Sequence, residues 1–281
     1  MAGTLYLVAT PIGNLGDITY RAVETLKQVD AIVAEDTRRA RILCDRFGIG
    51  AKLVSMPAFR EQQQAAALVA RLEAGESLAL VTDAGSPGIS DPGTAVVQQA
   101  VGKGIRVVPI PGASAVIAAL SASGLPTDRF HFVGFLPRKG TARERELLLL
   151  KRLGATLVLY ESPERLGATL RELAGVFGDR RAVVARELTK LHEELARGRL
   201  GELAERFSGR VRGEITLLVE GVSEEAAEVA SDEAIVAEVE RRLTAGEGSV
   251  KEIAKDLASA TGRPRSEVYS LALRAKESMG R

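Results

Sequence analysis

The sequence predicts an α/β protein with two α/β lobes and a small C-terminal helical domain. Short apolar runs alternate with helical patterns from residue 4 onward, the alternation breaks at 126–140 and then resumes, and beyond Gly221 the composition shifts to Ala, Glu and Val. Strands that alternate with helices and are apolar throughout are typical of a parallel sheet covered on both faces. We therefore expect a first lobe at 1–123, a second at 124–222 and a helical domain at 223–281.

The elements of the first lobe follow one another in regular order. The expected strands are 4–9, 31–34, 52–56, 77–82 and 106–110. The expected helices are 17–29, 38–47, 61–74, 94–101 and 113–122. Segment 126–140 has two prolines and three of the seven phenylalanines, so we interpret it as a linker that also forms a wall of a functional site.

The second lobe repeats the α/β pattern. Its expected helices are 141–152 and 163–177, and its expected strands are 156–160, 182–186 and 215–219. Segment 192–207 fits part strand and part helix. Everything after Gly221 is expected to be helical.

Composition excludes several classes of function. Lys and Arg number 38 against 37 Asp and Glu, a net charge of +1. The protein therefore does not bind a partner through an overall positive charge, but the net charge does not exclude a local basic patch. Cys44 is the one cysteine, which excludes an intrachain disulfide and a cysteine-based zinc site. His131 and His192 are the only histidines, so no metal site is expected.

The sequence gives no sign of membrane association. No basic segment precedes the first apolar run, and no apolar stretch approaches the roughly 20 residues of a membrane span. We expect a cytoplasmic protein with no membrane partner.

Three loops rich in Gly and Pro follow strands of the first lobe, at 10–14, 83–93 and 109–114. Ligands bind outside the carboxyl ends of strands in open α/β sheets, and Gly lets backbone approach a ligand closely. Each loop alone also fits a tight turn, but three at one edge favour a ligand cleft. The glycine-rich dinucleotide and P-loop patterns are absent, which disfavours a nicotinamide dehydrogenase or a P-loop NTPase.

Charged residues also gather at expected strand ends. They lie in Glu35–Arg39, in Tyr160–Ser162 and in Arg186–Lys190. Helix capping explains the first group equally well, and an ordinary surface ion pair explains Glu187 with Lys190.

Seven segments in this order identify a resemblance that covers nearly the whole chain: LYLVATPIGNLGDIT, AEDTR, TDAGSPGISDPG, VVPIPGASAVIAAL, GLPTDRFHFVGFLPRKG, YESPERL and ARELTK. The chain resembles the ribosomal RNA small-subunit 2′-O-ribose methyltransferase I family, within the tetrapyrrole-methylase-like (class III) methyltransferases. The resemblance implies two α/β lobes with S-adenosylmethionine in the cleft between them, and a homodimer. It also implies that the substrate is a cytidine ribose in the decoding region of small-subunit ribosomal RNA, either bare or in the 30S particle.

Carried over to this chain, the resemblance implies a cofactor site drawn from both lobes. The implied residues are Ile12, Asp83, Gly85, Ser86, Ile89, Ser114, Ala115, Tyr160, Ala185 and Glu214. Methyl transfer to a hydroxyl needs alignment and a base that takes the proton. Asp36, Glu161 and Glu187 are the candidate bases, and Arg38 and Lys190 are candidates to bind phosphate or to lower the pKa of the hydroxyl.

The C-terminal segment has a helix-turn-helix outline. A helix at 249–258 is followed by a turn at 261–266 and a second helix at 267–276. Lysines and arginines available for phosphate are Lys251, Lys255, Arg263, Arg265, Arg274 and Lys276. These residues fit either an RNA-docking domain or a solvated cap on the second lobe, and the family resemblance implies RNA docking.

Three rival functions remain open at this point. One is a methyltransferase of the same class that acts on a corrin-like small molecule, against which the helical tail and the basic EDTRR segment argue. The second is a non-catalytic RNA-binding sensor of the cofactor, which would bind S-adenosylmethionine without turnover. The third is a nucleotide hydrolase, which the absence of a clear metal-binding carboxylate cluster disfavours.

Overall fold

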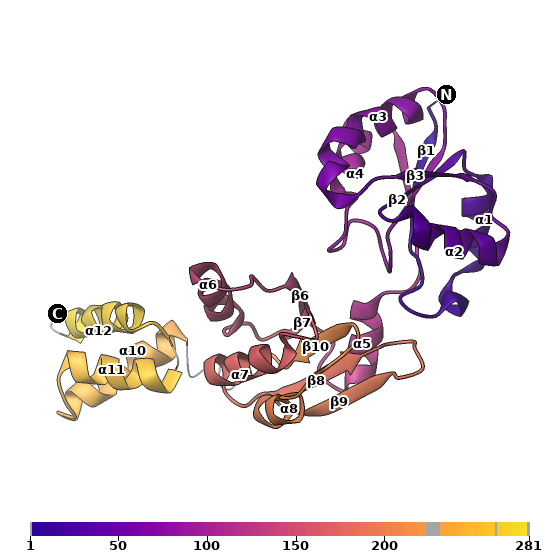
Figure 1. The fold of residues 1–281 in the computed structure, drawn as a ribbon. Helices are drawn as coiled ribbons and strands as arrows, with labels where there is room; N and C mark the ends of the chain where they lie inside the picture. Colours follow the sequence, from indigo (N-terminus) through magenta and orange to yellow (C-terminus); the bar gives the residue numbers. More distant parts are fainter. Residues whose placement is uncertain (1, 223–230, 262, 280–281) are drawn as a thin grey trace.

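The computed structural model describes residues 2–222, 231–261 and 263–279. Two five-stranded sheets form two lobes, and a group of three helices follows them (Figure 1). This arrangement confirms the α/β fold class expected from the sequence.

The first lobe holds an entirely parallel sheet with the strand order β3-β2-β4-β1-β5. Its strands are β1 (Thr4–Val8), β2 (Ala31–Ala34), β3 (Lys52–Ser55), β4 (Leu78–Val81) and β5 (Arg106–Ile110). Its helices are η1 (Leu15–Asp17), α1 (Tyr20–Gln28), α2 (Thr37–Phe47), η2 (Ala58–Arg60), α3 (Glu61–Glu73) and α4 (Thr94–Gly102). All five expected strands are confirmed to within two residues at each end.

Apolar side chains on both faces explain why the central strands are apolar throughout. In β2, Ala31 and Val33 face a core shared with α3 and α4, while Ile32 and Ala34 face a core shared with α1 and α2. Alternate residues of a strand point to opposite faces, so a doubly covered strand needs apolar residues at every position. The helix expected at 17–29 begins later, at Tyr20, because the Thr19 hydroxyl caps it by accepting a hydrogen bond from the Ala22 N–H at 3.1 Å.

The second lobe holds a mixed sheet with the order β6-β7-β10-β8-β9. Only β6 and β7 are parallel; β10 runs antiparallel to both of its neighbours, and β9 is antiparallel to β8. The strands are β6 (Phe130–Phe135), β7 (Thr156–Glu161), β8 (Arg181–Arg186), β9 (Glu194–Arg199) and β10 (Ile215–Val219). Helices α6 (Thr141–Leu150), α7 (Leu166–Phe177) and α8 (Leu200–Arg206) share one core with one face of this sheet.

Two sequence interpretations change in this lobe. Segment 126–140 is not simply a linker, because its centre forms β6 at the sheet edge. A register shift between Phe132 and Gly134, whose φ is +69°, breaks the alternation that would have marked a strand. Segment 192–207, left open between strand and helix, contains both: β9 and then α8.

Helix α5 (Ala115–Ser123) belongs by packing to the second lobe. Its Val116, Ala119 and Leu120 share a core with Val158 of β7 and Leu218 of β10. The second lobe was expected to begin at residue 124, so this helix lies on the other side of the expected limit. The chain therefore crosses between the lobes just before α5, in the loop at 111–114.

The C-terminal domain consists of α10 (Asp232–Thr244), α11 (Val250–Thr261) and α12 (Arg265–Met279) around a small apolar core. The two helices expected from the sequence correspond to α11 and α12. Residues 223–230 and 262, which belong to the expected domain and turn, lie outside the described residues. An ion pair at 3.2 Å between Arg152 and Glu267 of α12 joins the domain to the second lobe, at the end farther from the first lobe (Figure 1).

Candidate functional site

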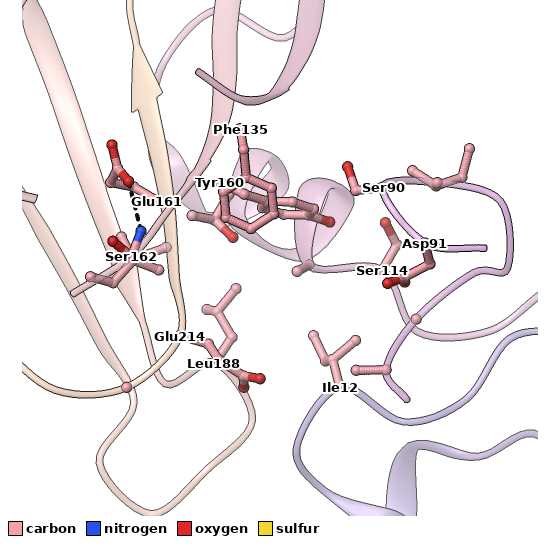
Figure 2. A pocket seen from close by; sticks show the side chains of 18 of the residues that line it. Ile12, Ser90, Asp91, Ser114, Phe135, Tyr160, Glu161, Ser162, Leu188 and Glu214 are labelled. Carbon is pink, nitrogen blue, oxygen red and sulfur yellow. Dashed lines mark hydrogen bonds between the residues drawn. The ribbon is translucent and has the colours of Figure 1, made fainter. Parts of the chain in front are cut away.

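A pocket of about 420 Å³ lies between the two lobes (Figure 2). On the first-lobe side it is bordered by the loops that follow β1 and β4, and the start of α5 borders it where the chain crosses between the lobes. On the second-lobe side it is bordered by β6, the ends of β7 and β8 and the start of β10. Because β10 is antiparallel to β7 and β8, these three strand termini meet at one edge of the sheet.

The loop after β4 forms much of the first-lobe wall. Four of its residues have positive φ: Gly85 (+82°), Gly88 (+80°), Ser90 (+61°) and Gly93 (+140°). Glycine adopts such conformations without a steric cost, which accounts for the glycine pattern read in the sequence. Reciprocal backbone hydrogen bonds between Thr10 and Gly85, at 2.9 and 3.0 Å, tie this loop to the loop after β1.

The start of α5 contributes a hydroxyl and free backbone amides. Ser114 is the N-cap of this helix, and its Oγ accepts a hydrogen bond from the Ile117 N–H at 3.5 Å. Ser114 and Ala115 both line the pocket. The first turn of a helix leaves amide groups without intrahelical partners, which favours a negatively charged ligand group nearby.

Aromatic side chains cover part of the second-lobe side. The Tyr160 ring packs against Phe132, with the ring centres 5.1 Å apart, and against Phe135, with the centres 5.5 Å apart. Tyr160 and Phe135 line the pocket and are seen in the middle of the view in Figure 2. Burial, together with the negative charge of Asp91, raises the pKa of the Tyr160 hydroxyl, so this group stays neutral near pH 7.

A charged cluster lies beside Glu214 at the rim of the pocket. The Lys190 Nζ donates hydrogen bonds to Glu187 Oε1 at 2.8 Å and to Glu214 Oε2 at 2.5 Å. The hydrogen bond from Lys190, with a second from the Glu214 N–H, lowers the pKa of Glu187. This cluster faces the first lobe closely, since a Cβ on Gly13 would lie 2.7 Å from Lys190 Cγ.

The structure brings together nine of the ten residues implied for the cofactor. Those that line the pocket are Ile12, Gly85, Ser86, Ile89, Ser114, Ala115, Tyr160, Ala185 and Glu214. Asp83 does not line it. Its carboxylate pairs instead with Arg39 of α2 at 3.3 Å.

The candidate catalytic residues are spread over three places. Asp36 caps α2 by accepting from the Arg38 N–H at 2.9 Å, and the Arg38 guanidinium binds both of its oxygens, which lowers the pKa of Asp36 to about 2. Glu161 lines the pocket, but its side chain is only 2% exposed. Glu187 and Lys190 form the rim cluster described above. Of the five candidates, only Glu161 is a lining residue.

Several lining residues lie in segments that were selected from the sequence, but were not named there as site residues. Ser90, Asp91, Phe135 and Leu188 are the clearest of them. Phe135 lies in segment 126–140, which was expected to form a wall of the site, although no residue of it was selected individually. Asp91 lies in the same Gly/Pro loop as Ser86 and Ile89, so its position in that loop was the available signal.

The comparisons with known proteins agree on one family. Residues 4–204 match the family of tetrapyrrole (corrin/porphyrin) methylases. A protein of Halalkalibacterium halodurans named ribosomal RNA small subunit methyltransferase I is 45% identical over 273 residues, 96% of this chain and 94% of that protein. A protein of the same name from Xylella fastidiosa is 46% identical over 272 residues, 95% of this chain and 98% of that protein.

A solved structure shows the same fold. The crystal structure of uroporphyrin-III C-methyl transferase from Thermus thermophilus complexed with S-adenyl homocysteine matches with a TM-score of 0.56 at 20% identity. The match covers 77% of this chain and 97% of that one. At this identity the match supports the two-lobed fold.

The residues of the pocket fit S-adenosylmethionine. The pocket volume falls within the roughly 300–1,000 Å³ of small-molecule sites. Apolar side chains such as Ile12, Leu188 and Ile215 suit a purine ring, and the amides at the start of α5 suit a carboxylate. In the described ranges, no group of three or more His, Cys, Asp or Glu side chains is arranged to hold a metal ion.

No described helix is long and apolar enough to cross a membrane. Sequence similarity over nearly the whole chain, the family match, the fold and the two-lobed pocket all lead to the same assignment. The chain belongs to the tetrapyrrole methylase family of S-adenosylmethionine-dependent methyltransferases and, within it, to the ribosomal RNA small subunit methyltransferase I family.

Proposed function

We propose that this protein transfers a methyl group from S-adenosylmethionine to the 2′-hydroxyl of a cytidine ribose in the decoding region of small-subunit ribosomal RNA. The main support for this proposal is the pocket between the lobes, together with 45–46% identity to relatives named ribosomal RNA small subunit methyltransferase I. A bare or 30S-bound RNA is the substrate, the active form is a homodimer, and the reaction takes place in the cytoplasm.

Bound cofactor supplies an electrophilic methyl group, and the protein supplies alignment and proton transfer. The first-lobe loops and α5 hold the cofactor through Ser86, Ile89 and Ser114. Tyr160 and Ala185 close the pocket from the second lobe. A hydroxyl is a weak nucleophile at neutral pH, so a carboxylate that receives its proton during attack accelerates the reaction.

Two basic side chains that do not line the pocket, Arg38 and Lys190, are proposed to bind phosphate groups of the RNA backbone. The Arg38 side chain is 89% exposed, so it can exchange Asp36 for a phosphate group. Lys190, at the rim, lies where it can contact a phosphate or stabilise a developing alkoxide. Asp36, Glu161 and Glu187 remain the carboxylates proposed from sequence as bases.

The C-terminal domain is proposed to dock RNA at a distance from the pocket. Its exposed basic residues are Lys251, Lys255, Arg265, Arg274 and Lys276. Arg263 is held by Asp232 and Glu267, so it has a structural role within the domain. Phosphate contacts of this kind position RNA without reading its sequence.

Methylation of purified substrates tests the function directly. We expect methyl-labelled S-adenosylmethionine to label small-subunit RNA, with the label mapping to the 2′-oxygen of one cytidine. The control is the same small-subunit RNA already methylated at that ribose, which should stay unlabelled. Label on the base, label on a corrin-like acceptor instead, or cofactor binding without any transfer would each contradict the proposal.

Removal of the C-terminal domain tests the docking role. A chain ending at Val222 should keep its affinity for S-adenosylmethionine, because none of the described residues beyond Thr216 lines the pocket. Its affinity for small-subunit RNA should fall at least tenfold, and the dependence of binding on salt should weaken as phosphate contacts are lost. An unchanged RNA affinity would show that the domain does not dock RNA.

A further inference from the structure

The proposed function requires a general base, and the structure contains a carboxylate that meets the requirements better than those expected from sequence. Such a group must lie on the pocket wall, keep an oxygen free for the substrate proton, and have a pKa near the working pH. The identity of this base depends on the proposed function.

Glu161 lies on the wall, but its oxygens are already engaged. Its Oε1 accepts from the Ser162 N–H at 2.8 Å, and its Oε2 accepts from the Thr169 hydroxyl at 2.6 Å. Arg165 forms an ion pair with it at 3.4 Å. With a side chain 2% exposed, Glu161 anchors β7 to α7 and has no oxygen to offer a substrate.

The other carboxylates expected from the sequence at or near the pocket are held by cations. Arg38 binds both oxygens of Asp36, and Lys190 binds both Glu187 and Glu214. These contacts lower the pKa values of Asp36 and Glu187, which makes both groups weaker bases. Each would have to break an ion pair before it could take a proton.

Asp91 satisfies the geometric requirements. It lines the pocket from the loop after β4, on the wall that also carries Ser90 and Ser114, while Glu161 and Ser162 lie at the far side of the cavity (Figure 2). Among the described residues, no Lys or Arg forms an ion pair with it, and no positive charge acts on its pKa. No cation therefore has to be displaced before this carboxylate can contact a ligand.

The backbone around Asp91 fixes its position. The preceding Ser90 has a φ of +61°, a conformation that costs a non-glycine residue free energy and that persists where surrounding structure imposes it. The following Pro92 and Gly93 are buried, and the Gly88 N–H donates to the Pro92 carbonyl at 3.2 Å. Strain held next to a pocket-lining carboxylate is common at catalytic sites.

The surroundings of Asp91 also suit a base. Burial raises the pKa of its carboxyl, the charge of Asp83 raises it further, and the Thr82 hydroxyl opposes the increase. Glu35, whose own pKa is raised by burial and by Asp83 and Asp91, adds negative charge at the same edge of the sheet. Arg39 pairs with Asp83, and Tyr160 faces Asp91 from the second lobe as a neutral hydroxyl.

We propose that Asp91 is the general base of the methyl transfer. Its carboxylate receives the proton of the ribose 2′-hydroxyl while the ribose oxygen forms a bond to the methyl carbon. The bond between that carbon and sulfur breaks, its electron pair stays on sulfur, and S-adenosylhomocysteine is released. Asp91 then returns its proton to solvent.

Replacement of the carboxylate tests this role. Asp91→Asn should lower the single-turnover rate of RNA methylation by about 10²- to 10⁴-fold, the usual contribution of a general base. The dissociation constant of S-adenosylmethionine, measured by calorimetry, should change less than about threefold. The matched control is Asp45→Asn, an exposed residue of α2 away from the pocket, which should keep the parental rate.

The pH profile separates a base from a structural residue. In the parent, the rate should fall as pH decreases through a pKa above the ordinary Asp value of 3.8, because protonated Asp91 cannot accept a proton. Asp91→Asn should lose this limb, and Asp91→Glu should keep it at a reduced rate. Folding of each variant is checked by its melting curve and by its cofactor affinity.

Three outcomes would overturn the inference. They are an Asp91→Asn rate near the parental value, an unchanged pH limb in that variant, and a loss of cofactor affinity that accounts for the whole loss of rate. A parent protein that transfers no methyl group to ribose would instead refute the proposed function. The two failures are distinguishable. The first is seen in the methylation activity of the parent protein alone, and the second in the ratio of the variant's methylation rate to that of the parent.

Discussion

The two walls of the pocket are built in different ways. The first-lobe wall is largely backbone, shaped by four residues at positive φ between Gly85 and Gly93. The second-lobe wall is made by side chains at strand ends, such as Tyr160, Ala185 and Ile215. The first wall therefore depends on which backbone conformations its residues can adopt, and the second on the shape and area of its side chains.

Sheet topology explains the difference. In the parallel sheet of the first lobe, every strand leaves the pocket edge through a connecting loop, so loops form the wall. In the second lobe β10 lies antiparallel between β7 and β8, so the start of one strand and the ends of two others meet at the edge. Regular strand termini then bring their side chains to the pocket directly.

The largest effect is expected for a substitution in the backbone wall. Gly93→Ala places a side chain at a φ of +140°, and the added Cβ would lie 2.8 Å from Leu80 Cδ2 in the core. Strain and overpacking together should reduce the free energy of unfolding by at least ~2 kcal/mol and weaken cofactor binding. Denaturant unfolding and calorimetry measure the two effects.

A glycine without these constraints provides the control. Gly102→Ala, at the end of α4, meets no atom within 4 Å and should leave cofactor affinity unchanged. If Gly93→Ala were equally harmless, the backbone of this loop would not be what shapes the first-lobe wall.

A smaller effect is expected on the side-chain wall. Tyr160→Ala removes a ring that packs against Phe132 and Phe135, and aromatic pairs contribute about 0.5–1.5 kcal/mol beyond the area they bury. We expect cofactor affinity to fall about tenfold, while Tyr160→Phe, which keeps the ring, retains most of it. Calorimetric titration of both variants distinguishes ring packing from the hydroxyl. Equal losses in the two variants would assign the contribution to the hydroxyl instead.

Sequence patterns predicted the first lobe well because local and tertiary preferences agree there. The strands β2 and β4 are buried at every position, and glycines mark the loops that need positive φ. The second lobe was harder. In β6 a register shift interrupts the alternation, and α5 packs across the expected domain limit in a way that apolar spacing alone does not reveal.

The role of individual carboxylates was also beyond sequence reasoning. Glu161, the last residue of β7, and Asp91, in the loop after β4, both line the pocket. Both oxygens of Glu161 accept hydrogen bonds and Arg165 pairs with it, whereas no ion pair holds Asp91 among the described residues. That distinction depends on Thr169 and Arg165 of the helical segment after β7, which bring their polar groups to Glu161 only in the folded chain. Residue type and position near a strand end cannot separate these cases.

The smallest effect concerns the rim, where the two walls meet. Because Lys190 lowers the pKa of Glu187 from its ordinary 4.5, this carboxylate stabilises the fold above that pH, and the contribution is lost as pH falls toward the lower pKa of the folded protein. Lys190→Met should raise the pKa of Glu187 and flatten this part of the stability curve, by less than about 1 kcal/mol because the pair is partly exposed. Urea unfolding between pH 3 and pH 6 measures the change. Lys103→Met, which removes an exposed pair with Glu73 at 3.3 Å, is the matched control, and the same flattening in that variant would show that the rim cluster has no special role.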